Sequence, residues 1–411
     1  MNGAVLAECS SLTMTPRVRR GWLGFSRHEL AFAVLVTMAV TFGSIHANLV
    51  YHMSGQTKDF GIFYDATRDF LAHRDMYASG HDLNPPHLHL LLVPLAVLQP
   101  AAAFAVWGVL SLGCLIASLW FILREAKIAP TRWHLAFCAV AVISSAATSA
   151  VIVNGQLSWI LMLPVTLAWV AARRSRWAPA GALVGAALTV KPFLLIVLAY
   201  FILARRWRAL AFATAAAAAC LTVGVILFGV SPYLGWIRAL RGVSWTYLPI
   251  NASLMGFLTR TFTDTSSLEP PHFGALVVWT SLVRPLWIAG AGVLGLGTLA
   301  ALRLDDAPAS VDRSFALLLV ASLLISPLGW VYYAWFPLGP AVAATSTWWK
   351  RRDLSRHLLC AVLGIAFCPV LATMLFQPHG WATATLGSVY FWGLSALWLA
   401  LIIAPSGARH E

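Results

Sequence analysis

The chain has 411 residues, of which 60% are apolar and only 10% are charged. In soluble domains about a quarter of all residues are charged, so this composition excludes an ordinary soluble protein. The net charge of +13 does not indicate nucleic-acid binding, because the basic residues lie in short clusters between apolar runs, as the positive-inside rule describes for membrane proteins.

Apolar residues form continuous runs long enough to cross the hydrocarbon core of a bilayer, which is about 30 Å thick. Continuous rather than alternating runs favour helices over the strands of a barrel. In chain order, we expect spans at 29–50, 101–123, 133–153, 156–172, 178–190, 193–204, 208–230, 275–302, 313–327, 330–346, 356–376 and 384–404. The sequence therefore predicts an all-α integral membrane protein with about 12 transmembrane helices.

The residues around Lys191-Pro192 decide how the later spans are oriented. Basic clusters at 173–176 and 205–208 flank this region, and the positive-inside rule places both on the cytoplasmic side. Because proline interrupts a helix, we expect two short helices that form a hairpin. The alternative is one kinked span, which would invert every later segment.

With the hairpin, both termini face the cytoplasm. We expect a single transmembrane domain over 29–404, preceded by a cytoplasmic segment at 1–28 and followed by a cytoplasmic tail at 405–411. Residues 51–100 and 231–273 then form the two extracytoplasmic loops.

Polar and turn-forming motifs gather on the outer side of this topology, whereas the inner bends carry mostly basic anchors. The motifs are Lys58-Asp59-Phe60, Asn84-Pro85-Pro86, Asn154-Gly155-Gln156, Lys191-Pro192, Asn251-Ala252-Ser253-Leu254, Ser326-Pro327-Leu328-Gly329-Trp330 and Gln377-Pro378-His379-Gly380-Trp381. This asymmetry favours an enzyme with its site at the outer surface over a channel or a structural protein.

Asp59 is the first candidate for chemistry, about nine residues beyond the first span. A carboxylate near the outer interface can act as a general base, although acidic residues in loops are most often simply solvated. Asp65 and Asp69 are four residues apart, which is the spacing of an ordinary exposed helix face.

Lys191 is a cation inside an apolar stretch, and ionisable residues at membrane depth are costly and often functional. It could hold a phosphate as a point charge, or extend its ammonium group to the interface as a snorkelling lysine. Arg238, Arg241 and Arg260 in the second outer loop could also bind the phosphate, or could contact lipid headgroups.

No metal or cofactor is expected. The six cysteines are scattered and form no C-x-x-C pair, so the sequence indicates neither a disulfide framework nor a zinc site. His87 and His89 are two residues apart, with no cysteine nearby to complete a metal site.

The order and spacing of these motifs resemble glycosyltransferase family 87, whose members are integral membrane enzymes of the GT-C class. The resemblance covers most of residues 55–345. It is carried by Asp59-Phe60, Phe63-Tyr64, Leu71, Tyr77, Asn84-Pro85-Pro86, Pro94, Trp107, Asn154-Gly155-Gln156, Gly181 to Lys191-Pro192, Arg205-Arg206-Trp207-Arg208, Asn251-Ala252-Ser253-Leu254 and Ser326-Pro327-Leu328-Gly329-Trp330.

The resemblance implies a GT-C-like bundle in a bacterial inner membrane that moves a hexose, with mannose as the expected sugar. The donor would be a polyprenyl-phosphate sugar and the acceptor a glycan or glycolipid. Asp59 would deprotonate the acceptor for an inverting attack, while Lys191 and an arginine would stabilise the departing phosphate. The expected substrate-binding residues are Phe60, Tyr64, Asn84, Asn154, Gln156, Asn251, Trp330, Tyr332 and Tyr333.

The chain departs from the family pattern at two places. Family members often carry histidines after the S-P-x-x-W motif, where Val331-Tyr332-Tyr333 stand here, and they often carry tyrosine where Asn84 stands. The rival functions are a flippase or transporter of lipid-linked sugars and a polysaccharide polymerase or ligase. Transporters often contain inverted repeats, and the sequence shows none.

Overall fold

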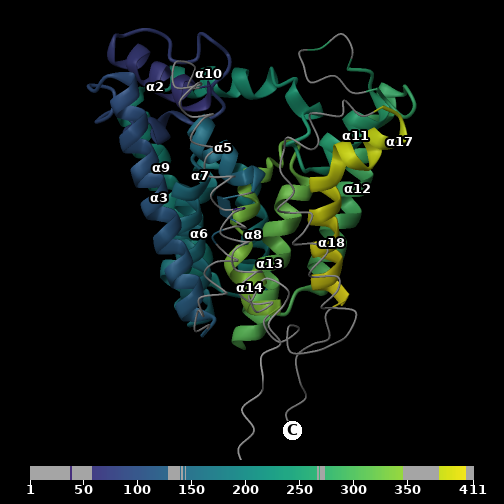
Figure 1. Cartoon of the computed structure of the whole chain (residues 1–411). Helices are drawn as coiled ribbons and strands as arrows, with labels where there is room; N and C mark the ends of the chain where they lie inside the picture. Colours follow the sequence, from purple (N-terminus) through teal and green to yellow (C-terminus); the bar gives the residue numbers. More distant parts are fainter. Residues whose placement is uncertain are drawn as a thin grey trace, which may run out of the picture.

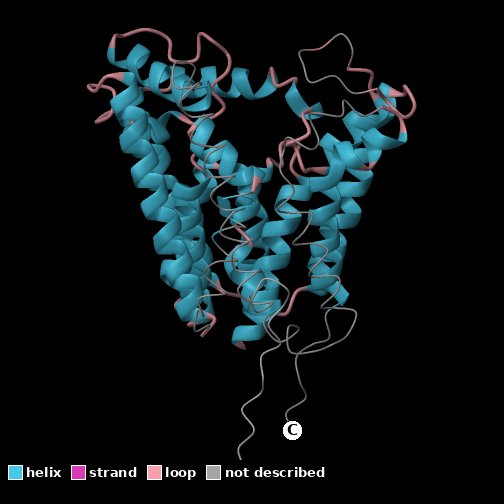
Figure 2. Ribbon diagram, in the orientation of Figure 1, coloured by secondary structure: helices cyan, strands magenta, loops and turns pink. Residues whose placement is uncertain are grey.

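The computed structural model describes residues 58–127, 145–265, 274–345 and 379–403, with isolated positions at 38, 139, 142, 143 and 268. In these ranges the regular structure is helical, and two isolated bridges are the only β-type pairings (Figure 2). The spans expected at 29–50 and 356–376, the N-terminal segment at 1–28 and the tail at 405–411 lie outside the described residues.

Long apolar helices confirm an α-helical membrane protein. Five helical stretches among the described residues are long and apolar enough to cross a bilayer: α3 (Pro100–Glu125), α9 (Trp207–Phe228), α12 (Thr280–Ala301), α13 (Pro308–Ile325), and the stretch Trp381–Ile403. The last stretch consists of α17 (Trp381–Ala384), η6 (Leu386–Ser388) and α18 (Val389–Ile403). The expected total of about twelve spans stays a prediction.

Shorter apolar helices lie close to the spans expected at 156–172, 178–190 and 193–204. They are α6 (Ser158–Arg173), α7 (Trp177–Val190), η2 (Pro192–Leu195) and α8 (Ile196–Leu203), and they follow α5 (Ala146–Asn154). The single span expected at 330–346 is instead divided into η4 (Val331–Trp335) and α14 (Leu338–Thr345). Between α7 and η2, Lys191 has extended backbone angles (φ −129°, ψ 92°). The proline at 192 thus ends one helix and begins the next.

The hairpin around Lys191 is confirmed. The guanidinium of Arg206 lies 4.7 Å from the ring centroid of Trp177, so the residue directly before α9 meets the first residue of α7. Both basic clusters therefore lie at the same end of the bundle, and the alternative of one kinked span is wrong. α7 and α9 consequently run parallel, with Gly181 packed on the backbone of Ala209 and Gly185 on that of Ala213.

The tip of this hairpin does not reach the level of the C-terminal end of the neighbouring helix, α9. Because Gly181 lies level with Ala209, the end of α7 at Val190 lies level with residue 218, ten residues before α9 ends at Phe228. At 1.5 Å per residue, the tip therefore stops about 15 Å short of the end of α9. The short helix η1 (Pro86–Leu91) fills the space above it, because His87 contacts both Thr189 near the tip and Gly224 of α9. The tip is therefore recessed, not at the outer interface as the sequence suggested.

α13 is the central helix of the bundle. α6, α8, α12, α14 and α18 pack around it, and nearly all of its side chains are buried (Figure 1). From Phe315 onward a central helix of this kind is apolar on nearly all sides, because little of its surface meets lipid or water.

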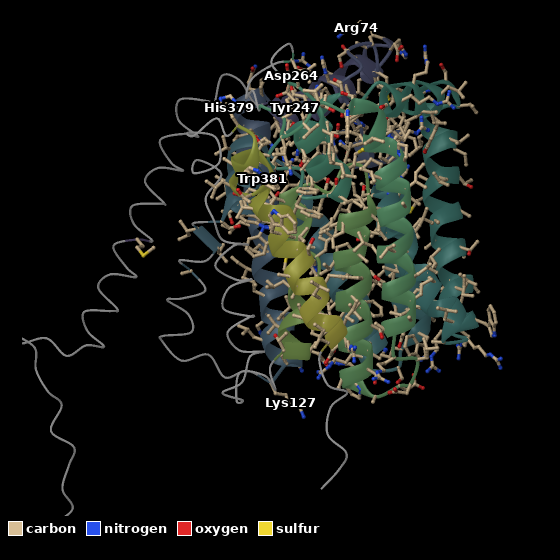
Figure 3. The ribbon with its side chains drawn as sticks, turned by 90° about the vertical axis from the view of Figure 1, so that its right-hand side faces the viewer. Arg74, Lys127, Tyr247, Asp264, His379 and Trp381 are labelled. Atoms are coloured by element: carbon tan, nitrogen blue, oxygen red, sulfur yellow. The ribbon has the colours of Figure 1, made fainter. Side chains whose placement is uncertain are left out.

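The two ends of the bundle differ in character. At one end lie α2 (Lys58–Leu71), α10 (Ser231–Arg241) and α11 (Leu254–Phe262), and we call it the site end (Figure 1). Lys127 lies at the opposite end from Arg74, Tyr247 and His379 (Figure 3). We call that opposite end the basic end.

Ion pairs tie the helices together at the basic end. Arg173 of α6 contacts Glu125 of α3 at 3.2 Å and Asp312 of α13 at 3.0 Å. Arg206 is paired with Asp306 in the connection between α12 and α13. These acids offset the basic clusters that the sequence places there.

Candidate functional site

Asp59 lies in the first turn of α2. The next residue, Phe60, is buried, with its ring 5.5 Å from that of Phe104 and 5.8 Å from that of Trp107 on α3. One turn later, the Tyr64 hydroxyl donates a hydrogen bond of 2.7 Å to the carbonyl of Leu98. Phe60 and Tyr64 therefore anchor α2, which sets the position of Asp59.

The Asn154-Gly155-Gln156 motif meets Asp59 directly. Gly155 ends α5 in the left-handed conformation (φ 69°), and Trp107 Nε1 donates to its carbonyl at 2.8 Å. The chain then turns so that Gln156 Nε2 donates a 2.6 Å hydrogen bond to Asp59 Oδ2. Asn154 is half-buried at the end of α5. Two motifs far apart in sequence thus form one arrangement.

Lys191 does not extend to the interface as a snorkelling lysine. Its ammonium group donates a hydrogen bond of 2.9 Å to Asn84 Oδ1, and Asn84 is buried. Nζ also lies 5.4 Å from the ring centroid of Tyr333. The charge of Asp59 lies close enough to act on both Lys191 and Tyr333.

Aromatic residues after the Ser326–Trp330 turn line this region. η4 (Val331–Trp335) carries Tyr332 and Tyr333, which are both buried. Tyr332 stacks on Trp330 at 6.1 Å between ring centroids, and the Tyr333 ring lies 5.3 Å from that of Phe193, beside the hairpin tip. Tyr333, in the third position after this turn, therefore lies beside Lys191.

Asn251 has a structural position instead of an open one. It is fully buried, and its amide nitrogen donates to the carbonyls of Thr246 and Pro327 at 2.9 and 3.0 Å. Its amide oxygen accepts from the backbone N–H groups of Ser253 and Gly329 at 3.2 and 3.0 Å. These four bonds use both N–H donors of the side chain and both lone pairs of its amide oxygen. Asn251 clamps two loops together, so the expectation of direct substrate contact does not fit this geometry.

The three candidate arginines occupy different environments. Arg238 and Arg241 are exposed at the end of α10. Arg260 is fully buried and donates to the carbonyls of Leu248 and Asn251 at 2.8 and 3.0 Å. Burial lowers the pKa of Arg260 to about 9.

Two residues next to the site had not been singled out for it from the sequence. Asp82 and His89 are fully buried, and Asp82 Oδ2 lies 3.0 Å from His89 Nε2. Asp82 Oδ1 accepts hydrogen bonds from the backbone N–H of Asn84 at 2.9 Å and from its amide at 3.0 Å. The D-x-N spacing is a local signal of this kind of turn. The contact with His89 has no such signal.

Residues 83–327 match the model of glycosyltransferase family 87. Over 376 residues the chain is 26% identical to a polyprenol-phosphate-mannose-dependent alpha-(1-2)-phosphatidylinositol mannoside mannosyltransferase of Mycobacterium tuberculosis (strain ATCC 25618 / H37Rv), covering 84% of this chain and 83% of that protein. No solved structure matches the chain. The family match includes Asn84, Gln156 and Lys191, whereas Asp59 precedes it.

Proposed function

Because the chain belongs to glycosyltransferase family 87, we propose that it moves a mannosyl residue from a polyprenyl-phosphate donor to a glycan or glycolipid acceptor, with inversion at the anomeric carbon. The family and the relative make it a membrane glycosyltransferase that uses a polyprenol-phosphate sugar. One observation carries the rest of the proposal: a carboxylate held by Gln156 and an ammonium group at a recessed hairpin tip lie toward the same end of the bundle, close enough for their charges to interact.

Asp59 is the general base in this proposal. The acceptor hydroxyl gives its proton to the carboxylate while its oxygen forms the new bond to the anomeric carbon. The bond from that carbon to the phosphate oxygen breaks at the same time, and the phosphate leaves with the bonding electrons. A single displacement from the opposite face inverts the configuration. The bond from Gln156 to Oδ2 fixes the carboxylate orientation for this step.

Lys191 receives the phosphate. Its ammonium group lies at the recessed tip, where a charge pair is stronger than in water because the local dielectric constant is lower. A prenyl phosphate is anchored in the bilayer by its tail, so a cation below the end of the bundle lies at a depth that its phosphate reaches. Arg238 and Arg241, which are exposed on α10, are placed to contact phosphate groups at the surface.

The sugar lies between these groups, against aromatic rings. Trp330, Tyr332 and Tyr333 form one stacked and one edge-to-face ring pair next to the tip. Aromatic faces pack on the apolar face of a sugar, and their polar edges remain available for hydrogen bonds. Asn154 at the end of α5 supplies a further amide for the sugar or the acceptor.

The site end faces away from the cytoplasm of a bacterial inner membrane in this proposal. Lys127, Arg174 and Arg205 lie at or next to helix ends of the basic end, the pattern that marks cytoplasmic loops. The donor sugar and the acceptor then meet on the extracytoplasmic side.

The direct test is transfer by the purified protein in liposomes. We expect radiolabel from polyprenyl-phosphate-mannose to appear in a lipid-linked or soluble glycan acceptor, and NMR of the product to show the inverted anomer. Parallel reactions with lipid-linked glucose and arabinose test the sugar. Label that crosses the bilayer without forming a product would indicate a flippase and contradict the proposal.

A further inference from the structure

A chain of buried polar side chains lies behind Lys191. We propose that Asp82 and His89 are positioning residues. They hold the side-chain amide oxygen of Asn84 toward Lys191 and so fix the ammonium group of Lys191 in the donor-phosphate site. This inference rests on the proposed function, because it presumes that Lys191 binds the phosphate. It adds two residues that do not themselves touch the substrate.

The chain of contacts begins on α2. The Thr67 hydroxyl donates to the carbonyl of Phe63 at 2.7 Å and lies 2.8 Å from His89 Nδ1. On its other side, His89 Nε2 lies 3.0 Å from Asp82 Oδ2. Thr67, Asp82 and His89 are all fully buried, so water does not compete for these contacts.

His89 has a buried polar group on each side of its ring. Nδ1 lies 2.8 Å from the Thr67 hydroxyl, and Nε2 lies 3.0 Å from Asp82 Oδ2. Among the described residues, neither Nε2 nor Oδ2 has a hydrogen-bond partner elsewhere. Because buried polar groups are costly unless they are paired, the imidazole is held between Thr67 and Asp82.

Asp82 then sets which way the Asn84 amide points. Asp82 Oδ1 accepts from the backbone N–H of Asn84 at 2.9 Å and from Nδ2 at 3.0 Å. The amide nitrogen faces the carboxylate, so the carbonyl oxygen faces Lys191 Nζ, at 2.9 Å. An amide rotated by half a turn would point its N–H groups at the ammonium group. The carboxylate is thus the reason that Asn84 is an acceptor for Lys191.

These contacts join three elements around the site. Thr67 lies on α2, which also carries Asp59, whereas His89 lies on η1 and Lys191 at the tip of the hairpin. These contacts connect α2 to the hairpin tip, and so they hold Asp59, the proposed base, and Lys191, the proposed phosphate-binding cation, in a fixed relative position. Pre-organised charges of this kind lose little free energy to rearrangement when the substrate arrives.

A double-mutant cycle tests the inference. Donor KM, acceptor KM and kcat are measured for Asp82→Asn, Lys191→Met and the double variant. We expect each single variant to raise donor KM about tenfold, the effect of losing one hydrogen bond to a charged group, with little change in acceptor KM. In the Lys191→Met background, Asp82→Asn should then raise donor KM by less than about twofold, because residues that act through one another are not additive.

Asp312→Asn is the matched control. Asp312 is also a buried aspartate in an ion pair, but it lies at the basic end with Arg173. Its loss should lower the yield of folded protein and leave donor KM unchanged. If Asp82→Asn does not accumulate, His89→Gln takes its place in the cycle, since it removes the residue that faces Asp82 Oδ2 and leaves Asn84 and Lys191 unchanged.

Two results would overturn the inference, and they differ in what else they reject. Effects of Asp82→Asn and Lys191→Met that multiply in the double variant would show that Asp82 acts independently of Lys191, while the phosphate role of Lys191 stands. An unchanged donor KM in Lys191→Met would reject that phosphate role itself, and the positioning role with it.

Discussion

The pairing of Asp59 with Gln156 is the contact on which the proposed chemistry depends most. The two side chains are 97 positions apart in sequence, and a hydrogen bond of 2.6 Å joins them. An amide that donates to one carboxylate oxygen restrains the orientation of the whole group. A base held in this way does not lose free energy to reorientation during proton transfer.

Asp59→Asn keeps the size of this side chain and an oxygen for Gln156 but cannot accept a full proton. We expect kcat to fall by a factor of about a hundred or more, the usual range for a general base, with donor binding retained. Asp69→Asn is the control, because Asp69 lies on the same helix in an exposed ion pair with Arg74. Sugar transfer and donor binding are measured for both variants. Near-parental transfer by Asp59→Asn would remove this residue from the mechanism.

Gly155 is required both for its left-handed backbone conformation and for its close packing on Phe60. A comparison with Gly80 separates these two effects. Its φ of 69° disfavours any residue with a Cβ, and an added Cβ would lie 2.5 Å from the Cβ of Phe60. Gly80 has nearly the same φ, 68°, but open space around it. The backbone strain alone costs about 1 to 2 kcal/mol.

We therefore expect Gly80→Ala to lower the thermal stability slightly and leave transfer unchanged. Gly155→Ala should lower stability more and also reduce kcat, because displacing Phe60 moves the neighbouring Asp59. Thermal unfolding and transfer rate are measured on both variants. Equal losses in the two would show that packing on Phe60 does not position the base.

At the scale of the elements, the hairpin of α7 and α8 is held by close packing on α9. Small residues let two helices approach within backbone contact, which is a common basis of helix association in membranes. Gly181 and Gly185 are one turn apart and face the backbones of Ala209 and Ala213. This packing sets the depth of the tip and hence of Lys191.

Replacing either glycine should separate the helices. We expect Gly181→Ala and Gly185→Ala to destabilise the protein by about 1 to 3 kcal/mol through overpacking, and to raise donor KM because the tip moves. Gly108→Ala and Gly113→Ala in α3 are matched controls, since an added Cβ there has nothing within 4 Å. Alanine favours helix by about 1 kcal/mol, so these controls should be neutral or slightly stabilised in thermal unfolding. Destabilisation of all four would point to an effect other than helix contact.

At the scale of the whole molecule, the two ends of the bundle are chemically distinct. The basic clusters at 173–176 and 205–208 lie at one end and the proposed site at the other, and the parallel course of α7 and α9 enforces this separation. A membrane enzyme that uses a lipid-linked sugar needs such polarity, because donor and acceptor must meet on one side of the bilayer.

Cysteine labelling measures the sidedness. In a background without native cysteines, Lys127→Cys and Ser175→Cys should react with a membrane-impermeant maleimide only in inside-out vesicles. Arg74→Cys, Ser79→Cys and His379→Cys should react in intact spheroplasts, since all five positions are exposed. Labelling of the first pair from outside would invert the topology and reject an extracytoplasmic site.

The family of the enzyme and its membrane class follow from the sequence. Apolar runs and basic clusters are local in the chain, and their free energies of transfer to lipid hardly depend on which helices become neighbours. A proline and two flanking basic clusters favoured the hairpin at Lys191-Pro192, whereas the contact between Arg206 and Trp177 in the structure excluded one kinked span. The grouping of Asp59, Gln156 and Lys191 at one end is a consequence of that topology.

Only the tertiary structure decided how those residues touch and at what depth. No local sequence pattern indicates that Gln156 donates a hydrogen bond to Asp59, or that the Asn251 side chain bonds to two loops. None indicates that Asp82 and His89 form a buried pair next to Asn84, the partner of Lys191. Each of these contacts joins elements whose distance is set by side-chain packing across the bundle. A few ångströms of helix approach, such as the glycine contact between α7 and α9, decide whether a polar group meets a partner, and hydrophobic pattern alone does not encode that distance.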